Sequence, residues 1–201
     1  MSSPASSTDY RGEWPLLLRE YQRLEADFLF LTEFVPLLDD PNAPNFQFGS
    51  PRAASFGLDC CTWIETSFKW LLRSPKWDKD VEVVRARDED ENIGMYRRMF
   101  DSRCKLADGG RTTIDTNLTV YPFQDFKEKK TPQWFADFSR PKHDRFELAR
   151  LWTMMHSAQS LAGLSVVMSA LVTPSMAFNV ESKVFRDTRF PSHLPKGSPF
   201  W

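Results

Sequence analysis

The residues best suited to chemistry lie together in one short basic segment, Lys142-His143-Asp144-Arg145-Phe146-Glu147. Asp144 and Glu147 have the three-residue spacing of a capping box, which places His143 immediately before a helix. Free backbone N–H groups and the helix dipole attract anions to such a helix end, and Lys142 and Arg145 add two cations. A histidine side chain can also move protons near neutral pH. The segment therefore predicts either a phosphate site with acid–base capability or a polar helix cap with solvated charges.

The other two histidines carry weaker signals. His156 lies among apolar residues of a predicted helix, where a packing role is expected. Arg150 precedes it in the same segment, and steps of about 100° per residue place the two side chains on different faces of a continuous helix. His193 lies close to the last residue of the chain. The histidines lack metal-ligand spacing, and HExxH, GxGxxG, GxSxG and phosphate-binding-loop motifs are absent, so we expect no metal and no other cofactor.

The composition limits the classes of protein to which the chain can belong. The chain has 201 residues, with 26 Lys and Arg against 27 Asp and Glu and a formal net charge of -1. This balance excludes a broadly basic nucleic-acid coat protein but permits a local basic site. Hydrophobic residues make up 41% and charged residues 26%, which excludes a mostly disordered chain. The aromatic content of 14% predicts a large core within one domain.

Cysteine usage and hydropathy predict a soluble cytoplasmic protein. Cys60, Cys61 and Cys104 form neither a disulfide framework nor a zinc-binding pattern, which is typical of a reducing compartment. The most apolar run, residues 161–172, is shorter than the roughly twenty residues that a membrane span needs. We therefore expect no membrane association, and we expect Cys60 and Cys61 inside the core.

Hydrophobic spacing predicts two long helices in the N-terminal part of the chain. Apolar residues from Trp14 to Leu38 recur every three or four positions on one helical face. The charged residues between them are expected mostly to face away from it: Arg19, Glu20, Arg23 and Glu25. A second helix begins near Ser50 and Pro51, a typical cap and first-turn pair. Because this helix is apolar around much of its circumference, we expect it at the centre of a bundle.

Two charged residues on the second helix have more than one interpretation. Glu65 and Lys69 are spaced i,i+4, which allows an ion pair along the helix. The same two side chains could instead line a cleft that also contains the basic segment. The sequence leaves both alternatives open.

Shorter elements and one further long helix are predicted in the rest of the chain. A short helix is expected over residues 93–103, and a β-hairpin insertion over about residues 104–121, where Asp108-Gly109-Gly110 supplies a turn and alternating hydrophobicity follows. The last long helix is expected over residues 145–172. Small side chains on one of its faces would allow the close approach of another helix, or a dimer contact.

The C-terminal residues carry little periodicity. Residues 173–201 contain several prolines and are expected either to lie on the bundle or to be mobile. The sequence thus predicts an all-α, up-and-down helical bundle with a small β-hairpin insertion. We expect one domain over residues 1–172, followed by this tail.

An ordered series of short motifs gives the chain a family resemblance. The motifs, from the second helix to the last, are Ile64-Glu65 with Phe68-Lys69, Tyr121-Pro122-Phe123, Pro132-Gln133-Trp134-Phe135, Lys142-His143-Asp144-Arg145 and Leu161-Ala162-Gly163-Leu164. In this order, across residues 21–171, the chain resembles HEPN-like bacterial proteins, particularly those related to abortive-infection systems. The resemblance rests on the order of the motifs, because each motif is short.

The resemblance implies an all-α bundle that forms a homodimer, and many members of the family are metal-independent endoribonucleases. In those members an arginine and a nearby histidine meet their symmetry mates in a composite cleft, where the RNA 2′-hydroxyl attacks the adjacent phosphate. His143 matches the catalytic histidine by position. The positions expected for the arginine hold other residues instead: Ala136, Asp137 and Phe138. Arg140 and Arg145 are the remaining groups that could stabilise charge on the phosphate.

Three hypotheses of function follow. The first is an endoribonuclease of a bacterial defence or toxin–antitoxin type system, which would have an antitoxin or defence protein as partner. In it His143 and Arg145 are catalytic, and Lys142 and Arg140 bind RNA phosphate. The second is a catalytically degenerate HEPN-like module that binds nucleotide, RNA or a partner protein through the same basic entrance. The third is a structural dimerisation protein whose aromatic residues fill its core.

Overall fold

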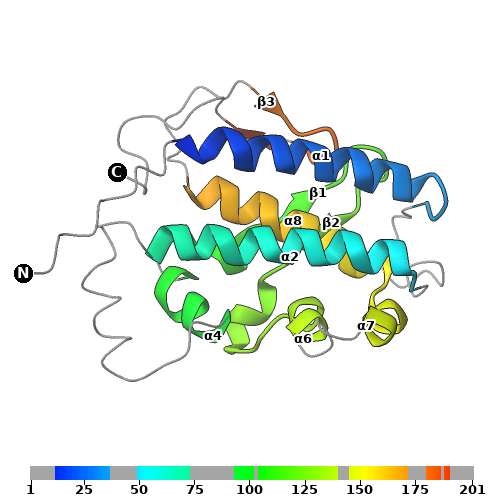
Figure 1. The fold of residues 1–201 in the computed structure, drawn as a ribbon. Coiled ribbons are helices and arrows are strands. Elements are labelled where there is room, and N and C mark those ends of the chain that lie inside the picture. Colours follow the sequence, from blue (N-terminus) through cyan, green and yellow to red (C-terminus); the bar gives the residue numbers. More distant parts are fainter. Residues whose placement is uncertain are drawn as a thin grey trace, which may run out of the picture.

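The chain folds into long helices that lie side by side, with shorter elements packed around them (Figure 1). The computed structural model describes residues 12–36, 49–72, 93–101, 104–139, 145–171, 180–186 and 188–190. The three long helices are α1 (Trp14–Thr32), α2 (Pro51–Leu72) and α8 (Met154–Leu171). α1 runs antiparallel to α2 and α8 (Figure 1). The predicted helical bundle with a small hairpin is therefore confirmed.

α2 lies at the centre of the bundle, as its hydrophobic pattern predicts. Ser50 caps the helix, because its Oγ accepts a hydrogen bond from the Ala53 backbone N–H at 3.0 Å, and Pro51 is the first helical residue. Buried side chains occupy both apolar stripes, including the fully buried Cys60 and Cys61. α2 packs against α1 on one side and against α6, α7 and α8 on the others.

Short elements connect α2 to the last helices and cover its lower side in Figure 1. In chain order they are α4 (Ile93–Tyr96), a π-helical turn η4 (Arg97–Asp101), the 3-10 turns η5 (Leu106–Asp108) and η6 (Gln124–Glu128), α6 (Gln133–Ser139) and α7 (Arg145–Leu151). The Tyr96 and Phe100 rings stack on Phe68 of α2 at centroid distances of 4.8 and 5.6 Å. Stacked aromatic rings therefore attach α4 and η4 to the central helix.

The predicted hairpin is present and is anchored to α8 by a half-buried arginine. β1 (Arg111–Thr112) pairs antiparallel with β2 (Thr119–Val120), with Arg111 opposite Val120. The Arg111 guanidinium donates to Ser165 Oγ at 2.7 Å, to Ser165 O at 3.1 Å and to Ser169 Oγ at 2.7 Å. Burial lowers the pKa of this guanidinium, since removal from water disfavours its charged form. Hydroxyl and carbonyl oxygens of α8 thus replace the water that Arg111 loses.

Part of the C-terminal region packs on the bundle. β3 (Val180–Glu181) pairs antiparallel with β4 (Arg189–Phe190), and Phe185 forms an isolated bridge with Thr113 next to β1. Phe190 is fully buried, and its ring meets Tyr21 of α1 edge to face at 4.9 Å. The sequence left open whether the tail lies on the bundle or is mobile. The described residues of the tail lie on the bundle.

Glu25 was predicted among the exposed charges of the first helix, and this prediction is wrong. Its side chain is only 1% exposed. One carboxylate oxygen, Oε1, accepts hydrogen bonds from the Ser182 hydroxyl and from the backbone N–H groups of Lys183 at 3.1 Å and Val184 at 3.4 Å. The C-terminal segment brings these donors to α1, so the burial of Glu25 depends on residues more than 150 positions away in the sequence.

The prediction of a single long helix over residues 145–172 is also wrong, because this region forms two helices, α7 and α8. The Trp152 N–H closes α7 by donating to Leu148 O at 2.8 Å. Thr153 then pairs with Gly49 in an isolated bridge, and its carbonyl accepts the Ser157 N–H at 3.1 Å as the first bond of α8. The strand-like Thr153 therefore separates the two helices.

The small residues of α8 pack against other elements of the same chain. Ala158, Ala162 and Ser165 are fully buried. At Gly163, an added Cβ would lie 3.1 Å from the Trp134 ring and 3.3 Å from Ile64 of α2. The close helix approach that these residues permit is thus made by elements of the same chain, and this face is not free for a dimer contact.

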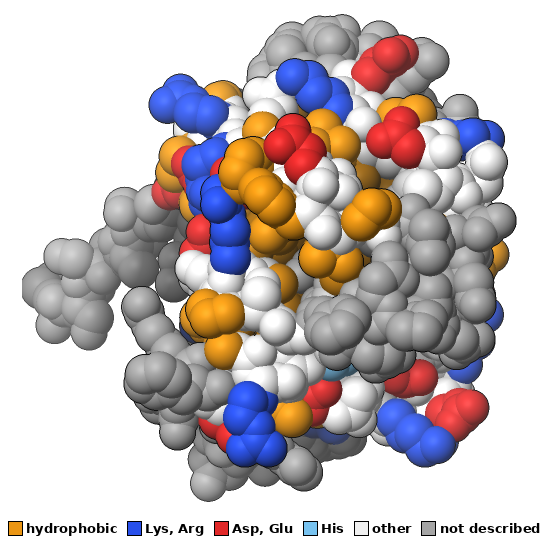
Figure 2. All heavy atoms as spheres, turned by 90° about the vertical axis from the view of Figure 1, so that its right-hand side faces the viewer, with side chains coloured by type: hydrophobic (Ala, Val, Ile, Leu, Met, Phe, Trp, Pro, Cys, Tyr) orange, Lys and Arg blue, Asp and Glu red, His pale blue; other side chains and the backbone are white. Residues whose placement is uncertain are grey.

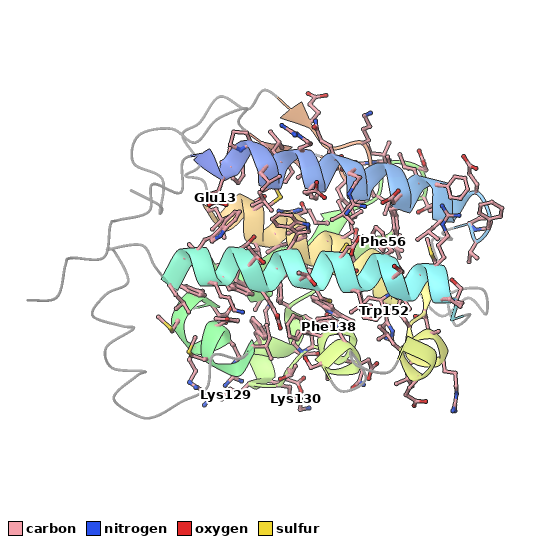
Figure 3. All side chains as sticks on the ribbon, viewed as in Figure 1. Glu13, Phe56, Lys129, Lys130, Phe138 and Trp152 are labelled. Carbon is pink, nitrogen blue, oxygen red and sulfur yellow. The ribbon has the colours of Figure 1, made fainter. Side chains whose placement is uncertain are left out.

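Trp152 and Gly57 give a direct test of the packing at the α7–α8 junction. The Trp152 ring lies against α2 (Figure 3), and a Cβ added to Gly57 would overlap it. Alanine normally stabilises a helix interior by about 1 kcal/mol relative to glycine. We expect Gly57→Ala to lower the free energy of unfolding by about 1–3 kcal/mol instead, because the buried ring has no room to move.

Urea unfolding measures this difference, with Ser55→Ala as the control. Ser55 is exposed on the same helix, so its replacement should leave stability nearly unchanged. A Gly57→Ala chain that is more stable than the wild type would contradict this packing.

Candidate functional site at the junction of α6, α7 and α8

The basic segment of the sequence connects α6 to α7. α6 ends at Ser139 and α7 begins at Arg145, which confirms the helix start expected immediately after Asp144. Arg140, Lys142 and His143 lie outside the described residues, and of Arg145 the structure describes only its place as the first residue of α7.

Among the described residues, Glu65 and Lys69 of α2 do not form the predicted ion pair. Glu65 is half-buried and Lys69 is exposed. Within the part of the chain that the structure describes, no ion pair joins them, so the i,i+4 pairing is not formed. Their other predicted role, lining a cleft with the basic segment, stays a prediction.

The α6 positions at which the family resemblance expects an arginine have structural roles here. Phe138 is 3% exposed and packs edge to face on Phe135 at 5.5 Å. Asp137 accepts a hydrogen bond from Gln133 Nε2 at 2.6 Å and also faces His156. This part of α6 therefore supplies an aromatic ring to the core and a carboxylate to the junction, but no cation.

His156 belongs to a capping box at the start of α8, which its sequence context did not lead us to expect. Thr153 Oγ1 accepts the His156 N–H at 3.2 Å, and His156 Nδ1 in turn accepts the Thr153 N–H at 3.4 Å. The His156 ring also meets Trp152 edge to face at 5.5 Å. The signal that could have located this helix start is the Thr-x-x-His spacing, in which histidine stands where Glu or Gln is usual.

The cap fixes the chemistry of the His156 ring. With Nδ1 acting as an acceptor, the neutral ring carries its proton on Nε2, which lies 3.7 Å from Asp137 Oδ2. Burial lowers the pKa of His156, opposed in part by the Asp137 carboxylate and the Leu151 carbonyl. The two side chains are 16% and 15% exposed, so solvent reaches both. The arrangement is a neutral imidazole with an adjacent carboxylate, which is capable of proton exchange but is also part of the helix cap.

Arg150 stands on the other side of the helix break from His156. The two residues therefore do not belong to one continuous helix, and their side chains have different surroundings. The Arg150 side chain is 80% exposed and pairs with Glu147 at 3.4 Å. Among the described residues, no hydrogen bond or ion pair links Arg150 to His156. The structure thus does not assemble an arginine–histidine pair from these two residues.

A second surface feature lies at the end of the bundle where α1 ends and α2 begins (Figure 2). Apolar side chains gather on this face (Figure 2). At this end of α1, Phe30 and Phe34 are exposed. A hollow of about 300 Å³ beside them is lined by Leu31, Val35 and Met154. The Arg52 guanidinium lies 4.1 Å from the centre of the Phe30 ring. Exposed apolar surface of this kind is typical of a contact area for another molecule.

Comparison of the chain with protein-family models, with curated proteins and with solved structures finds no match. Within the described ranges, no three His, Cys, Asp or Glu side chains gather so as to hold a metal ion. None of the helices that the structure describes combines the length and hydropathy required to span a membrane.

The His156 cap makes a prediction about pH. Because the native pKa of His156 lies below its value in the unfolded chain, the unfolded chain takes up a proton as the pH falls below about 6.5. We therefore expect the wild type to lose stability between about pH 6.5 and the lower native pKa, and His156→Gln to lose this component of the pH dependence. Urea unfolding from pH 8 to pH 5 measures both chains, with His193→Gln as the control. Parallel curves for the wild type and His156→Gln would contradict the assignment.

Proposed function

We propose that the protein is a metal-independent endoribonuclease of the HEPN-like type, in a bacterial defence or toxin–antitoxin type system. The observation that carries the proposal is the position of the basic segment at a helix start. α6 ends at Ser139 and α7 begins at Arg145, so Lys142 and His143 directly precede backbone N–H groups that favour a phosphate. The near-neutral charge of the whole chain favours one local phosphate site over broad nucleic-acid binding.

The proposed reaction needs an acid–base group and positive charge at one phosphate. His143 removes the proton from the RNA 2′-hydroxyl, O2′ attacks the adjacent phosphorus, and the bond to the leaving 5′-oxygen breaks. The leaving oxygen takes up a proton, and the products carry a 2′,3′-cyclic phosphate and a 5′-hydroxyl. Arg145, with Arg140, stabilises the charge that develops on the phosphoryl oxygens, and Lys142 holds the RNA backbone. The site is completed by a second copy of the chain, as the family resemblance implies.

A second candidate function is favoured by the residues of α6. Asp137 is engaged with Gln133 and His156, and Phe138 is buried, so the family's usual arginine has no replacement on this helix. A site that lacks this arginine would still attract phosphate through Lys142 and Arg145. The second candidate is therefore a HEPN-like module that binds RNA or nucleotide without cleaving it.

Cleavage in the presence of EDTA tests the first candidate. We expect the purified chain to produce RNA fragments with cyclic phosphate ends, and His143→Ala to slow their formation about a hundredfold or more, because acid–base groups contribute factors of that size. His193→Ala is the matched control and should retain the wild-type rate. Mass spectrometry of the fragment ends identifies the products.

Binding measurements separate the remaining outcomes. If the RNA stays intact but binds in a salt-dependent manner, and Lys142→Ala and Arg145→Ala weaken that binding, the second candidate replaces the first. If the chain neither cleaves nor binds RNA or nucleotides, both candidates fail and a structural role remains.

A further inference from the structure

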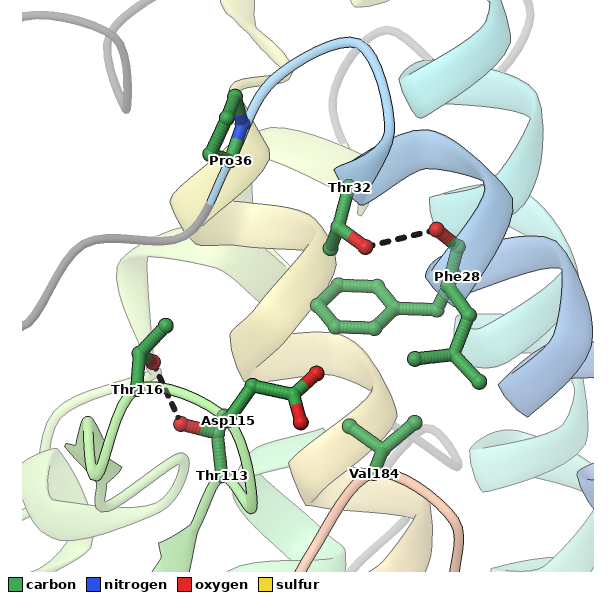
Figure 4. A pocket seen from close by; sticks show the side chains of 8 residues that line it. Phe28, Thr32, Pro36, Thr113, Asp115, Thr116 and Val184 are labelled. Atoms are coloured by element: carbon green, nitrogen blue, oxygen red, sulfur yellow. Dashed lines mark hydrogen bonds between the residues drawn. The ribbon is translucent and has the colours of Figure 1, made fainter.

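A separate cavity of about 170 Å³ lies between α1, the β1–β2 loop and the C-terminal segment (Figure 4). Phe28 and Thr32 of α1 form one wall. Thr113, Asp115 and Thr116 of the loop form the opposite wall, and Val184 closes the side. The basic segment that carries the proposed function contributes none of these residues, so ligand binding in this cavity does not depend on that function.

Hydrogen bonds hold the loop wall of the cavity in one shape. Thr113 Oγ1 lies 2.8 Å from Thr116 Oγ1 and accepts the Leu118 N–H at 3.1 Å. The Ile114 N–H donates to Val184 O at 2.9 Å, which joins the loop to the C-terminal segment. Because these bonds exist within the chain itself, the cavity is formed before any ligand enters.

The third wall is fixed through a buried carboxylate. The Val184 N–H donates to Ser182 Oγ at 3.2 Å and to the carboxylate of Glu25, one turn before Phe28 on α1, at 3.4 Å. Val184 is therefore held from both sides, by α1 through its N–H and by the β1–β2 loop through its carbonyl. A preformed pocket binds with a smaller loss of conformational entropy than one that must be ordered by its ligand.

One charged group points into this space. The Asp115 carboxylate is directed from the loop toward the gap between Phe28 and Val184 (Figure 4). Within the described ranges Asp115 has neither a hydrogen bond nor an ion pair. Arg186 binds the same loop, but its guanidinium donates to Ile114 O at 3.0 Å rather than to Asp115. The cavity thus has an exposed carboxylate at its edge, and Leu29 and Pro36 supply the accessible apolar surface beside it.

The remaining polar groups of the cavity are occupied by the protein. Thr32 Oγ1 donates to Leu29 O at 2.7 Å, and the hydroxyls of Thr113 and Thr116 bind each other. Their oxygens still have lone pairs that can accept a hydrogen bond, but the site offers few donors to an anion. The Phe28 ring is fully buried, so the hydroxyl acceptors and the carboxylate are the groups that favour a cation.

We propose that this cavity binds a small organic ammonium ion, with the ammonium group on Asp115 and a short apolar stem against Leu29 and Pro36. The size fits, since a cavity of about 150 Å³ is enough to hold a benzene ring. Two sources share this chemistry: a free primary amine and a lysine side chain of a partner protein. Binding of benzylamine and of a lysine-containing peptide distinguishes the two sources.

Titration of the isotope-labelled, full-length chain with benzylamine tests the proposal by NMR. Benzylamine should shift the amide signals of the loop around Asp115, and the neutral benzyl alcohol should bind at least about tenfold more weakly, because it cannot form a charge-assisted hydrogen bond. Asp115→Asn, which keeps the shape of the side chain, should weaken benzylamine binding by about tenfold. Asp125→Asn is the control, at a carboxylate of the 3-10 turn η6 outside this cavity, and should bind as the wild type does.

A second variant and a second ligand complete the test. Leu29 also lines the cavity, and Leu29→Trp should fill it from the α1 side and abolish binding while Asp115 remains in place. A lysine-containing peptide that binds more tightly than benzylamine would identify a protein partner, and the reverse order would identify a free amine. Equal binding of benzylamine and benzyl alcohol, unchanged binding by Asp115→Asn, or no response to either the amine or the peptide would overturn the proposal.

Discussion

The buried carboxylate of Glu25 is the constraint on which the arrangement of α1, the C-terminal segment and the β1–β2 loop depends. Removing a carboxylate from water is costly unless hydrogen-bond donors replace the water, and here burial raises the pKa of Glu25 although four donors oppose the effect. Three of those donors come from residues 182–184 and the fourth is the Tyr21 hydroxyl. The C-terminal segment must therefore occupy this position for α1 to bury its own carboxylate.

Hydroxyl groups extend this constraint to α8 and to the hairpin. The Tyr21 hydroxyl lies 3.4 Å from Ser182 Oγ and also has Ser165 as a hydrogen-bond partner. Ser165 in turn accepts from the half-buried guanidinium of Arg111. The buried Glu25 carboxylate and the half-buried Arg111 guanidinium thus stand at the two ends of a network of hydroxyl groups. Such networks specify a single arrangement, because each displaced member leaves a buried polar group unsatisfied.

Local sequence signals predicted the elements that depend on neighbouring residues. The capped start of α2 at Ser50, the hairpin after Asp108 and the helix start at Arg145 each follow from a short motif. Glu25 was placed wrongly because its donors lie far away in the sequence, and periodicity cannot detect them. The break at Thr153 was missed because the apolar pattern continues through it, while an unusual capping histidine marks the boundary. The Asp115 cavity was not predicted because its walls come from three segments that are far apart in the sequence, as are the donors to Glu25.

Hydrogen exchange at the backbone N–H groups of Lys183 and Val184 tests the central role of Glu25 most directly. In the wild type these groups should be protected, since they donate to a carboxylate with almost no exposure. Glu25→Ala should increase the exchange of the Lys183 N–H about a hundredfold or more and leave the α2 amides protected, whereas Glu20→Ala, which removes an exposed ion pair on the same helix, should change neither. The Val184 N–H keeps Ser182 Oγ as a second acceptor at 3.2 Å, so unchanged protection of Lys183 in Glu25→Ala is the result that would contradict this account.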